Sequence, residues 1–209
     1  MRPSPESKWQ SERGAEHYAS TRFRTTRARA RDPRMVAGIL SRYGASVPRT
    51  LLDAPCGSGR LTPWLEQPGC VTTGVDVSRS MLERAREDGG RRLVQASAAH
   101  LPFASGSFDH VVCCRLLHHL HEPEARLAVV RELVRVSRGL VIASFWDSAS
   151  LPQWRLRLGL KSAGPGDRRA VTRGHVADLF RQAGARVLAF RFCFRLVSQQ
   201  VFAVARKLP

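Results

Sequence analysis

The sequence predicts a single-domain α/β protein built on an open, mostly parallel sheet with helices on its faces. Strand-like apolar runs alternate with helix-like segments from residue 50 to residue 145, which is typical of a parallel sheet with crossover helices. Two further strand-like runs, 185–194 and 198–205, are joined by a short link at 195–197 and predict a closing antiparallel hairpin. With 209 residues and 43% apolar content, the chain can build one complete core.

The chain divides into a polar leader and a domain. Residues 1–31 are polar and rich in arginine, and residues 32–209 are expected to form the domain. Asp32 and Pro33 suit an N-cap followed by proline at the first helical position. The apolar face of the helix that they would open consists of Met35, Val36, Ile39 and Leu40, and the helix is expected to stop at Gly44.

An apolar strand at residues 50–54 runs directly into a glycine-rich turn. Asp53 lies near the end of that strand, and Gly57 and Gly59 follow it. Glycine adopts positive φ and has no Cβ, so such a turn lets the backbone pass close to a ligand. The sequence therefore predicts a ligand-binding turn between the first strand and the helix that follows.

A second apolar run, residues 70–75, ends in Asp76. An acid at the carboxyl end of the second strand of an open α/β sheet is placed to bind the two hydroxyls of a ribose. A dinucleotide site would need a third glycine where Thr62 stands, so that fingerprint is broken. The turn and the acid together predict a cofactor that carries a nucleoside.

Three stretches are similar to class I S-adenosylmethionine-dependent methyltransferases. The turn at 53–59 resembles their D-x-G-x-G turn. Residues 94–112 resemble G-D-A-x-x-L-P-F followed by F-D-x-V, and residues 113–123 resemble L-H-H-L-x-D-P, in the small-molecule enzymes of the ubiquinone and menaquinone type (methyltransferase type 11). The resemblance spans 16–206 and is strongest over 50–123. It implies a Rossmann-like sheet of seven strands flanked by helices, with S-adenosyl-L-methionine as the cofactor.

The resemblance also implies which residues hold the cofactor. At the methionine end of the cofactor, Asp53, Ala54, Gly57 and Gly59 would form the turn, and Arg115 would contact the methionine moiety through its backbone. Asp76 would hold the ribose, Val77 would flank the adenine, and Ser97 and Ala98 would contact the adenine amino group. Tyr18 would lie on an N-terminal helix that covers the site. The family has an acid where this chain has Ser97, and a neutral acceptor makes a weaker hydrogen bond. That departure leaves open a cofactor-binding module without catalysis.

Two adjacent histidines, His118 and His119, follow the fourth strand, whose end lies beside the transferable methyl group in this family. We expect them to line the site, and either could act as a general base because histidine titrates near neutral pH. Alignment of nucleophile, methyl group and sulfur supplies much of the rate of methyl transfer, so a base is not required. Adjacent side chains point apart and their spacing does not suit a metal ion, so no metal site is expected.

The segment 146–171 is expected to build the acceptor pocket, as it does in the family, with Trp146 and Trp154 as contacts. Three residues share the apolar face of its helix-like part: Leu151, Trp154 and Leu158. Arg155 and Arg157 lie elsewhere on that helix. A helix with an apolar face and basic residues fits contact with a small or lipid-like acceptor that carries an anionic group, or contact with a membrane surface. The alternative is that the helix simply packs on the sheet. The chain lacks the [D/N/S]-P-P-[Y/F/W] tetrapeptide of DNA and protein N-methyltransferases, which favours a small-molecule acceptor.

The net charge of +17 is the main argument for a nucleic-acid partner. Of the 34 basic residues only Lys8, Lys161 and Lys207 are lysine, and asparagine is absent, which fits a genome rich in G and C. That bias explains arginine in place of lysine but not the scarcity of acids. An RNA methyltransferase therefore stays the alternative to the small-molecule enzyme.

The sequence contains neither a membrane span nor a secretion signal. No apolar run approaches the roughly 18 residues that a span requires, and the first residues have no apolar signal core. The five cysteines form neither a disulfide framework nor a C-x-x-C pair. We therefore expect a cytoplasmic protein.

Overall fold

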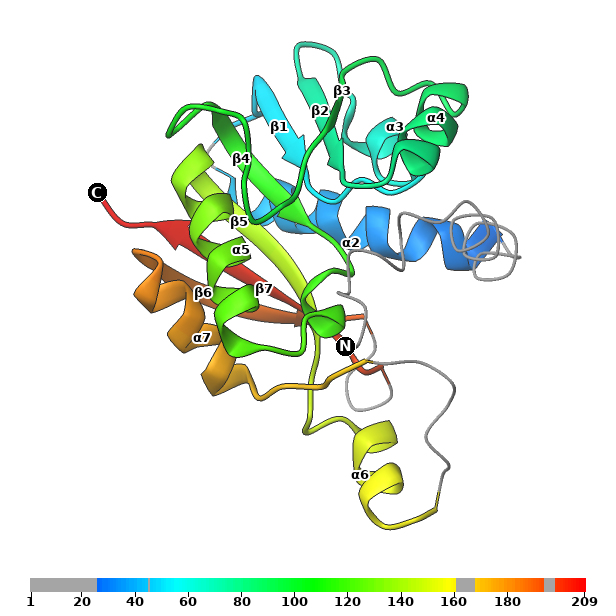
Figure 1. Ribbon diagram of the computed structural model, residues 1–209, viewed down its shortest axis with the longest axis vertical. Coiled ribbons are helices and arrows are strands. Elements are labelled where there is room, and N and C mark those ends of the chain that lie inside the picture. The colour runs from blue at the N-terminus through cyan, green and yellow to red at the C-terminus, as the bar shows by residue number, and fades with distance from the viewer. Residues whose placement is uncertain (1–25, 45, 161–167, 194–197) are drawn as a thin grey trace, which may run out of the picture.

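The computed structural model describes residues 26–44, 46–160, 168–193 and 198–209. They form a seven-stranded sheet in the order β3-β2-β1-β4-β5-β7-β6 (Figure 1). The strands are β1 (Thr50–Asp53), β2 (Val71–Asp76), β3 (Leu93–Gln95), β4 (Phe108–Cys113), β5 (Ser137–Trp146), β6 (Ala185–Phe192) and β7 (Gln200–Lys207). The helices are α2 (Thr26–Tyr43), α3 (Thr62–Leu65), α4 (Arg79–Glu87), α5 (Pro123–Val136), α6 (Leu151–Arg157) and α7 (Arg173–Gln182), with a short 3₁₀ helix η1 (Leu117–His119).

The strand directions agree with the sequence prediction. β1 to β5 pair in parallel, whereas β7 runs antiparallel to both β5 and β6. Strands buried on both faces read as continuous apolar runs, and the middle of β5 is such a run. The mostly parallel sheet with a closing antiparallel pair is confirmed, while the link expected at 195–197 lies outside the described residues.

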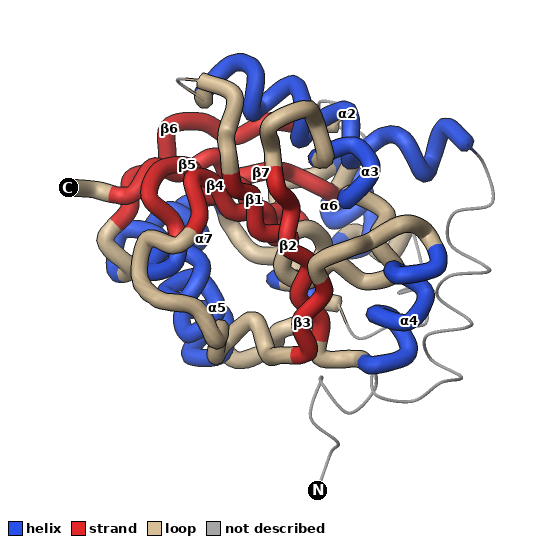
Figure 2. Tube along the Cα trace, turned by 90° about the horizontal axis from the view of Figure 1, so that it is seen from above, coloured by secondary structure: helices blue, strands red, loops and turns tan. Residues whose placement is uncertain are grey.

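Helices cover both faces of the sheet (Figure 2). On one face α2 and α3 pack through a cluster that includes Val36, Ile39, Leu65, Ile142 and Phe202. On the other face α5 and α7 pack through a cluster that includes Val130, Leu133, Phe145, Val176 and Phe180. Each fully buried Leu, Ile or Phe side chain stabilises the fold by roughly 1.5–3 kcal/mol, so both layers contribute to holding the sheet. The carboxyl ends of the parallel strands are left free to form a site.

α2 begins earlier than the sequence predicted. It spans Thr26–Tyr43 and passes through Pro33, so the predicted N-cap at Asp32 is wrong. The boundary drawn at residue 32 therefore falls inside a helix. The predicted apolar face is confirmed, because Val36 and Ile39 are buried against the sheet.

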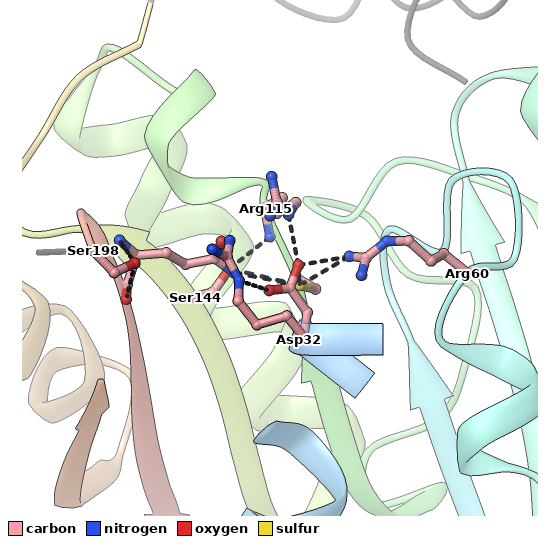
Figure 3. A network of polar contacts seen from close by, with 8 residues as sticks. Asp32, Arg60, Arg115, Ser144 and Ser198 are labelled. Carbon is pink, nitrogen blue, oxygen red and sulfur yellow. Dashed lines mark hydrogen bonds and ion pairs between the residues drawn. The ribbon is translucent and has the colours of Figure 1, made fainter. Parts of the chain in front are cut away.

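The Asp32 side chain is buried beneath α2, where it binds two arginines. Its Oδ2 lies 2.8 Å from an Nη atom of Arg60 and 2.7 Å from Nε of Arg115, and Asp32 is 0% exposed (Figure 3). Residues 26–31 are already helical, so Asp32 does not stand at the helix start, and its carboxylate binds the two arginines. Burial alone would raise the pKa of Asp32, but the charges of Arg115 and Arg60 hold it below its ordinary value.

α6 is the helix-like part of the segment 146–171, which was expected to build the acceptor pocket. None of its residues is buried, and Leu151 and Trp154 are 48% and 57% exposed. Figure 1 shows α6 standing apart from the sheet and its covering helices. The alternative expectation, that this segment packs on the sheet, is therefore wrong for α6. No helix in the described ranges is long and apolar enough to cross a membrane.

Asp32→Asn should lower the free energy of unfolding at neutral pH by roughly 3–5 kcal/mol, because two partly buried guanidinium groups lose the charge of the fully buried carboxylate. The folded-state pKa lies below the ordinary value of 3.8, so the carboxylate stabilises the fold above that pH. This contribution is lost as the pH falls through the folded-state pKa, and the two proteins should then converge. Urea unfolding over a pH series measures the difference.

Asp178→Asn is the matched control. Asp178 is 61% exposed and pairs with Arg181 on the surface of α7, and an exposed pair contributes only about 0–1 kcal/mol. Equal losses in the two variants would show that the buried network gives no special stability.

Candidate functional site

The glycine turn after β1 has two glycines with different tasks. Gly57 and Gly59 both have positive φ, 55° and 77°. A Cβ on Gly57 would meet no atom within 4 Å, whereas a Cβ on Gly59 would lie 3.1 Å from Cα of Ala85 in α4. Gly57 therefore leaves open space at the turn, and Gly59 lets α4 pack close to it.

Asp76, at the end of β2, is fixed by backbone groups. Its Oδ2 accepts a hydrogen bond from the N–H of Gly57 at 2.9 Å, and its Oδ1 accepts one from the N–H of Ser78 at 2.9 Å. Each carboxylate oxygen has a further lone pair available. Burial raises the pKa of Asp76, and the bonds from Ser78, Gly57 and Val77 oppose that rise. The carboxylate is thus oriented toward the cavity that it lines and can accept two hydroxyl groups.

Two adjoining cavities lie along the carboxyl edge of the sheet. The residues that line both are Pro55, Asp76, Val77, Leu116 and His119. The first cavity continues along the turn to Gly57, Arg60 and Arg115. The second continues to Ser97 and Ala98. The result is an elongated site with Asp76 at its middle, two arginines at one end and a neutral, mostly apolar end.

Most of the predicted cofactor residues meet in this site. Gly57, Asp76, Val77, Ser97, Ala98 and Arg115 line it. Ala54 is fully buried, and its N–H donates to the carbonyl of Val112 at 2.9 Å, so it holds β1 to β4. Tyr18 lies outside the described residues.

Arg115 has an unusual backbone. It is the non-glycine residue with positive φ (65°) among the described residues, which for a bulky side chain is a strained conformation. Its N–H donates to Oγ of Ser144 at 2.7 Å, and its Nε donates to Asp32. Two partners on different elements hold this conformation in place at the edge of the cavity.

Asp32 and Arg60 belong to the site's support although the sequence reasoning missed them. Arg60 lines the first cavity and binds Asp32. A signal was present: Asp32 precedes Val36 by four residues and Ile39 by seven, so it lies on the apolar face of its helix. A charged residue in the middle of an apolar stripe indicates a buried partner.

The two adjacent histidines have different environments. His119 lines both cavities. His118 is 1% exposed, and its ring stacks on Trp146 with centroids 4.9 Å apart and an angle of 10° between the planes. Of the two histidines that were predicted to line the site, His119 lines these two cavities and His118 does not.

The two predicted acceptor contacts also differ. Trp146 is packed between the ring of His118 and the guanidinium of Arg168, whose Cζ lies 5.1 Å from the Trp146 ring centre. Trp154 is exposed on α6 and lines neither cavity of the cofactor site. Within the described ranges, no group of three His, Cys, Asp or Glu side chains is arranged to hold a metal ion.

Asp53 lies behind the turn. It is 0% exposed, and neither carboxyl oxygen has a hydrogen-bond partner among the described residues. Burial raises the pKa of Asp53 to about 8; the charge of Arg60 opposes this rise and that of Asp76 adds to it. At neutral pH the ligand-free protein thus holds Asp53 mostly in its protonated form.

Asp53→Asn should make the ligand-free protein more stable at neutral pH. The unfolded chain releases this proton above 3.8 and the folded chain keeps it up to about 8, so wild type loses stability as the pH rises between these values. The amide has no proton to release, and each pKa unit corresponds to about 1.4 kcal/mol. Denaturant unfolding from acid to mildly alkaline pH should show that the free energy of unfolding of the variant rises relative to wild type as the pH rises.

Asp109→Asn provides the opposite control. Burial would raise the pKa of Asp109, but hydrogen bonds from the N–H groups of Thr50 and Arg49 lower it. This variant should therefore lose stability above that pKa. A parallel response of the two variants would contradict the assignment for Asp53.

Comparison with known proteins agrees with this geometry. Residues 52–142 match the family model described as a methyltransferase domain. A tRNA (carboxymethyluridine(34)-5-O)-methyltransferase of Arabidopsis thaliana is 31% identical over 147 residues, 67% of this chain and 33% of that protein. A ubiquinone biosynthesis O-methyltransferase of Aromatoleum aromaticum is 32% identical over 93 residues, 42% of this chain and 40% of that protein. The chain thus covers 33% of the length of the first of these relatives and 40% of the length of the second.

The fold has counterparts among solved structures. The magnesium protoporphyrin IX methyltransferase of Synechocystis with bound SAH superposes with a TM-score of 0.74 at 17% identity, covering 97% of this chain and 98% of that one. A protein of Pyrococcus horikoshii superposes with a TM-score of 0.73 at 22% identity, over 92% of this chain and 99% of that one. The chain thus matches a methyltransferase domain over residues 52–142, the segment that contains the glycine turn and Asp76, and it shares its fold with these solved structures.

Proposed function

We propose that this protein transfers a methyl group from S-adenosyl-L-methionine to a small-molecule acceptor. The observation that carries the proposal is the elongated double cavity with the oriented Asp76 carboxylate at its middle. A cofactor with an amino-acid end, a ribose and an adenine fits a site whose two ends differ in the same way. The cofactor itself supplies a methyl group on a positively charged sulfur.

The residues suggest how the cofactor would lie. Asp76 would accept hydrogen bonds from the ribose hydroxyls, and Val77 would flank the adenine. Ser97 and Ala98, at the neutral end, would face the amino edge of the base. The opposite end, with Arg60 and Arg115, would receive the amino-acid part, whose carboxylate suits a positive surrounding.

His119 is the residue that we propose beside the reacting atoms. It lines both cavities at their junction, next to Asp76 and Leu116. A histidine there can orient an acceptor hydroxyl or amine and take up its proton. Positioning of the acceptor is the larger contribution, since methyl transfer depends mainly on alignment.

The acceptor is proposed to be a small or lipid-like molecule with an apolar body. The curated relatives include a ubiquinone biosynthesis enzyme and enzymes named only as O-methyltransferases. The apolar face of α6 is exposed at Leu151, Trp154 and Leu158, so it can cover an acceptor or rest on a membrane surface. Trp154 stays our proposed acceptor contact.

RNA is the second candidate acceptor. Two observations favour it: the net charge of +17, and the likeness over 67% of this chain to a protein named as a tRNA methyltransferase. A non-catalytic binding module is the third reading, based on Ser97 where an acid is typical. The Asp76 and Trp154 experiments below separate these readings.

We further propose a cytoplasmic location. All five cysteines are free, and Cys56, Cys113 and Cys114 are buried. Thiols kept reduced without a disulfide are typical of a reducing compartment.

Asp76→Ala should weaken binding of S-adenosylhomocysteine by at least roughly ten- to a hundredfold, which is the loss expected for a single charge-assisted hydrogen bond of about 1.5–3 kcal/mol. Asp76→Asn, which keeps the shape and one acceptor oxygen, should weaken it less. Isothermal titration calorimetry measures both. NAD should not stabilise wild type against heat, whereas S-adenosylhomocysteine should.

Asp178→Ala serves as the control, since that surface acid lies on α7. An unchanged dissociation constant in a folded Asp76→Ala variant would contradict the ribose assignment. Stabilisation by NAD alone would contradict the cofactor.

Trp154→Ala should reduce methyl transfer to the acceptor while leaving S-adenosylhomocysteine affinity within a factor of about three, because exposed aromatic rings supply contact area without supporting the core. The measurement follows radiolabelled methyl from the cofactor into the small-molecule, lipid and RNA fractions of a cell extract. Trp64→Ala is the control, since Trp64 lies in α3, is 43% exposed and lines neither of the two cavities. Label that appears in RNA and in no small-molecule or lipid fraction would overturn the proposed acceptor class, and no label in any fraction would favour the binding module.

A further inference from the structure

We propose that a third cavity, called the basic cavity below, lies beside the starts of α5 and α7 and binds an oxyanion, a carboxylate or a phosphate, that belongs to the acceptor. Its volume is about 380 Å³, within the roughly 300–1,000 Å³ that is usual for small-molecule sites. The polar and charged residues that line it are His121, Arg126, Ser148, Arg157, Arg169, Thr172 and His175. None of the described lining residues is acidic. The link to the acceptor depends on the proposed function, whereas oxyanion binding does not.

Arg126 provides the strongest argument for an anion. It is only 3% exposed, yet none of its hydrogen bonds is to a carboxylate. Nη2 donates to the carbonyl of His121 at 2.9 Å, Nη1 lies 3.5 Å from Nε2 of His175, and Nε has no partner among the described residues. A buried charge without a counter-charge is costly, because its hydration is lost and nothing replaces it. A bound oxyanion would supply both the missing charge and acceptors for the guanidinium.

The surrounding charges also favour an anion. Burial lowers the pKa of Arg126, and the positive charge of Arg169 lowers it further. Glu122 and Glu124 oppose this effect, but both are exposed and neither lines the cavity. Arg157, in the last turn of α6, adds a third guanidinium.

Two helices begin at this cavity. α5 has 14 residues and α7 has 10, and Pro123 and Thr172 at their starts line it (Figure 1). The start of a helix carries a partial positive charge and free N–H groups. Thr172 caps α7 through the N–H of His175, whereas the N-cap of α5 makes no side-chain hydrogen bond. The start of α7 adds to the positive potential that the arginines create, whereas Glu122 and Glu124 offset that of α5.

The cavity lies close to the proposed reaction centre. His119 lines the cofactor site and His121 lines the basic cavity, so the same short segment forms a wall of both. Two residues apart, their Cα atoms are separated by at most about 7 Å. The N–H of Arg169 donates to the carbonyl of His118 at 2.8 Å, which ties the basic residues to that wall. The acceptor would therefore be compact, with its nucleophilic atom and its anionic group a short distance apart.

A single small oxyanion fits better than a nucleic-acid backbone. Binding to RNA needs basic side chains spread along a track of phosphates. Here three guanidinium groups, two imidazoles and two helix starts converge on one cavity, and the most buried of them can reach only a group that enters it.

The first test is direct binding of inorganic phosphate and of acetate to the full chain, followed through the imidazole NMR signals of His175 and His121. Saturable shifts with at least one of the two anions are expected. Arg169→Ala and Arg157→Ala, both at exposed positions, should weaken binding about tenfold each, since each removes a charge-assisted contact. Arg126→Lys keeps the charge but loses the fork of donors, and should also weaken it.

Arg131→Ala is the matched control. Arg131 is an exposed arginine further along α5 that does not line the cavity. It removes one exposed positive charge, as Arg169→Ala and Arg157→Ala do, and should leave binding unchanged within about twofold, because surface charges are screened by salt. Absence of a saturable shift with both anions, or an equal loss in Arg131→Ala, would overturn the oxyanion site.

The second test assigns the anion to the acceptor. Arg169→Ala should lower transfer of radiolabelled methyl into the small-molecule or lipid fraction while S-adenosylhomocysteine affinity stays at the wild-type value. Unchanged transfer would overturn this assignment, and so would a single-stranded RNA oligonucleotide that binds through Arg169 more tightly than phosphate. Failure of S-adenosylhomocysteine to bind wild type would instead contradict the proposed function, and phosphate binding would remain as a separate result.

Discussion

Parallel strands end at the same edge of a sheet, and the whole proposed cofactor site depends on that constraint. β1, β2 and β4 each deliver one polar residue to this edge: Asp53, Asp76 and, just after β4, Arg115. The strand order reverses at β1, with β2 and β3 on one side and β4 and β5 on the other, so the chain opens a crevice there. The antiparallel pair at the far edge contributes no described lining residue to the two cofactor cavities, and its role there is to bury β5.

Burial, as much as ion pairing, decides which ionisable side chains of this protein carry a charge. Asp32 is buried with two arginines and stays ionised, whereas Asp53 is buried without a hydrogen-bonded partner and keeps its proton up to about pH 8. Arg126 is buried without a carboxylate and, as a guanidinium, remains charged. The same chain thus shows three outcomes for a buried ionisable group: neutralisation by a partner, neutralisation by a proton, and a residual charge, for which we propose a bound oxyanion.

Much of the fold and part of the site could be predicted from local patterns. Gly57 and Asp76 were identifiable because a turn and a strand end are defined by residues next to one another in sequence. Asp32 was misread because its partners are distant in sequence and the local capping pattern was given more weight than its place on the apolar face of the helix. The two adjacent histidines could not be told apart, since a single 3₁₀ turn sends His119 to the cavities and His118 against Trp146.

The family match covers residues 52–142, yet the carboxylate that holds two arginines of the site comes from α2, before that segment begins. β7, which covers the open edge of β5, comes from beyond its end. A fragment cut to the recognisable segment would keep the glycine turn and Asp76, but it would expose Arg60 and Arg115 to one another without Asp32. Grafting this cofactor site onto another scaffold would therefore require α2 and the final strands to be carried with it.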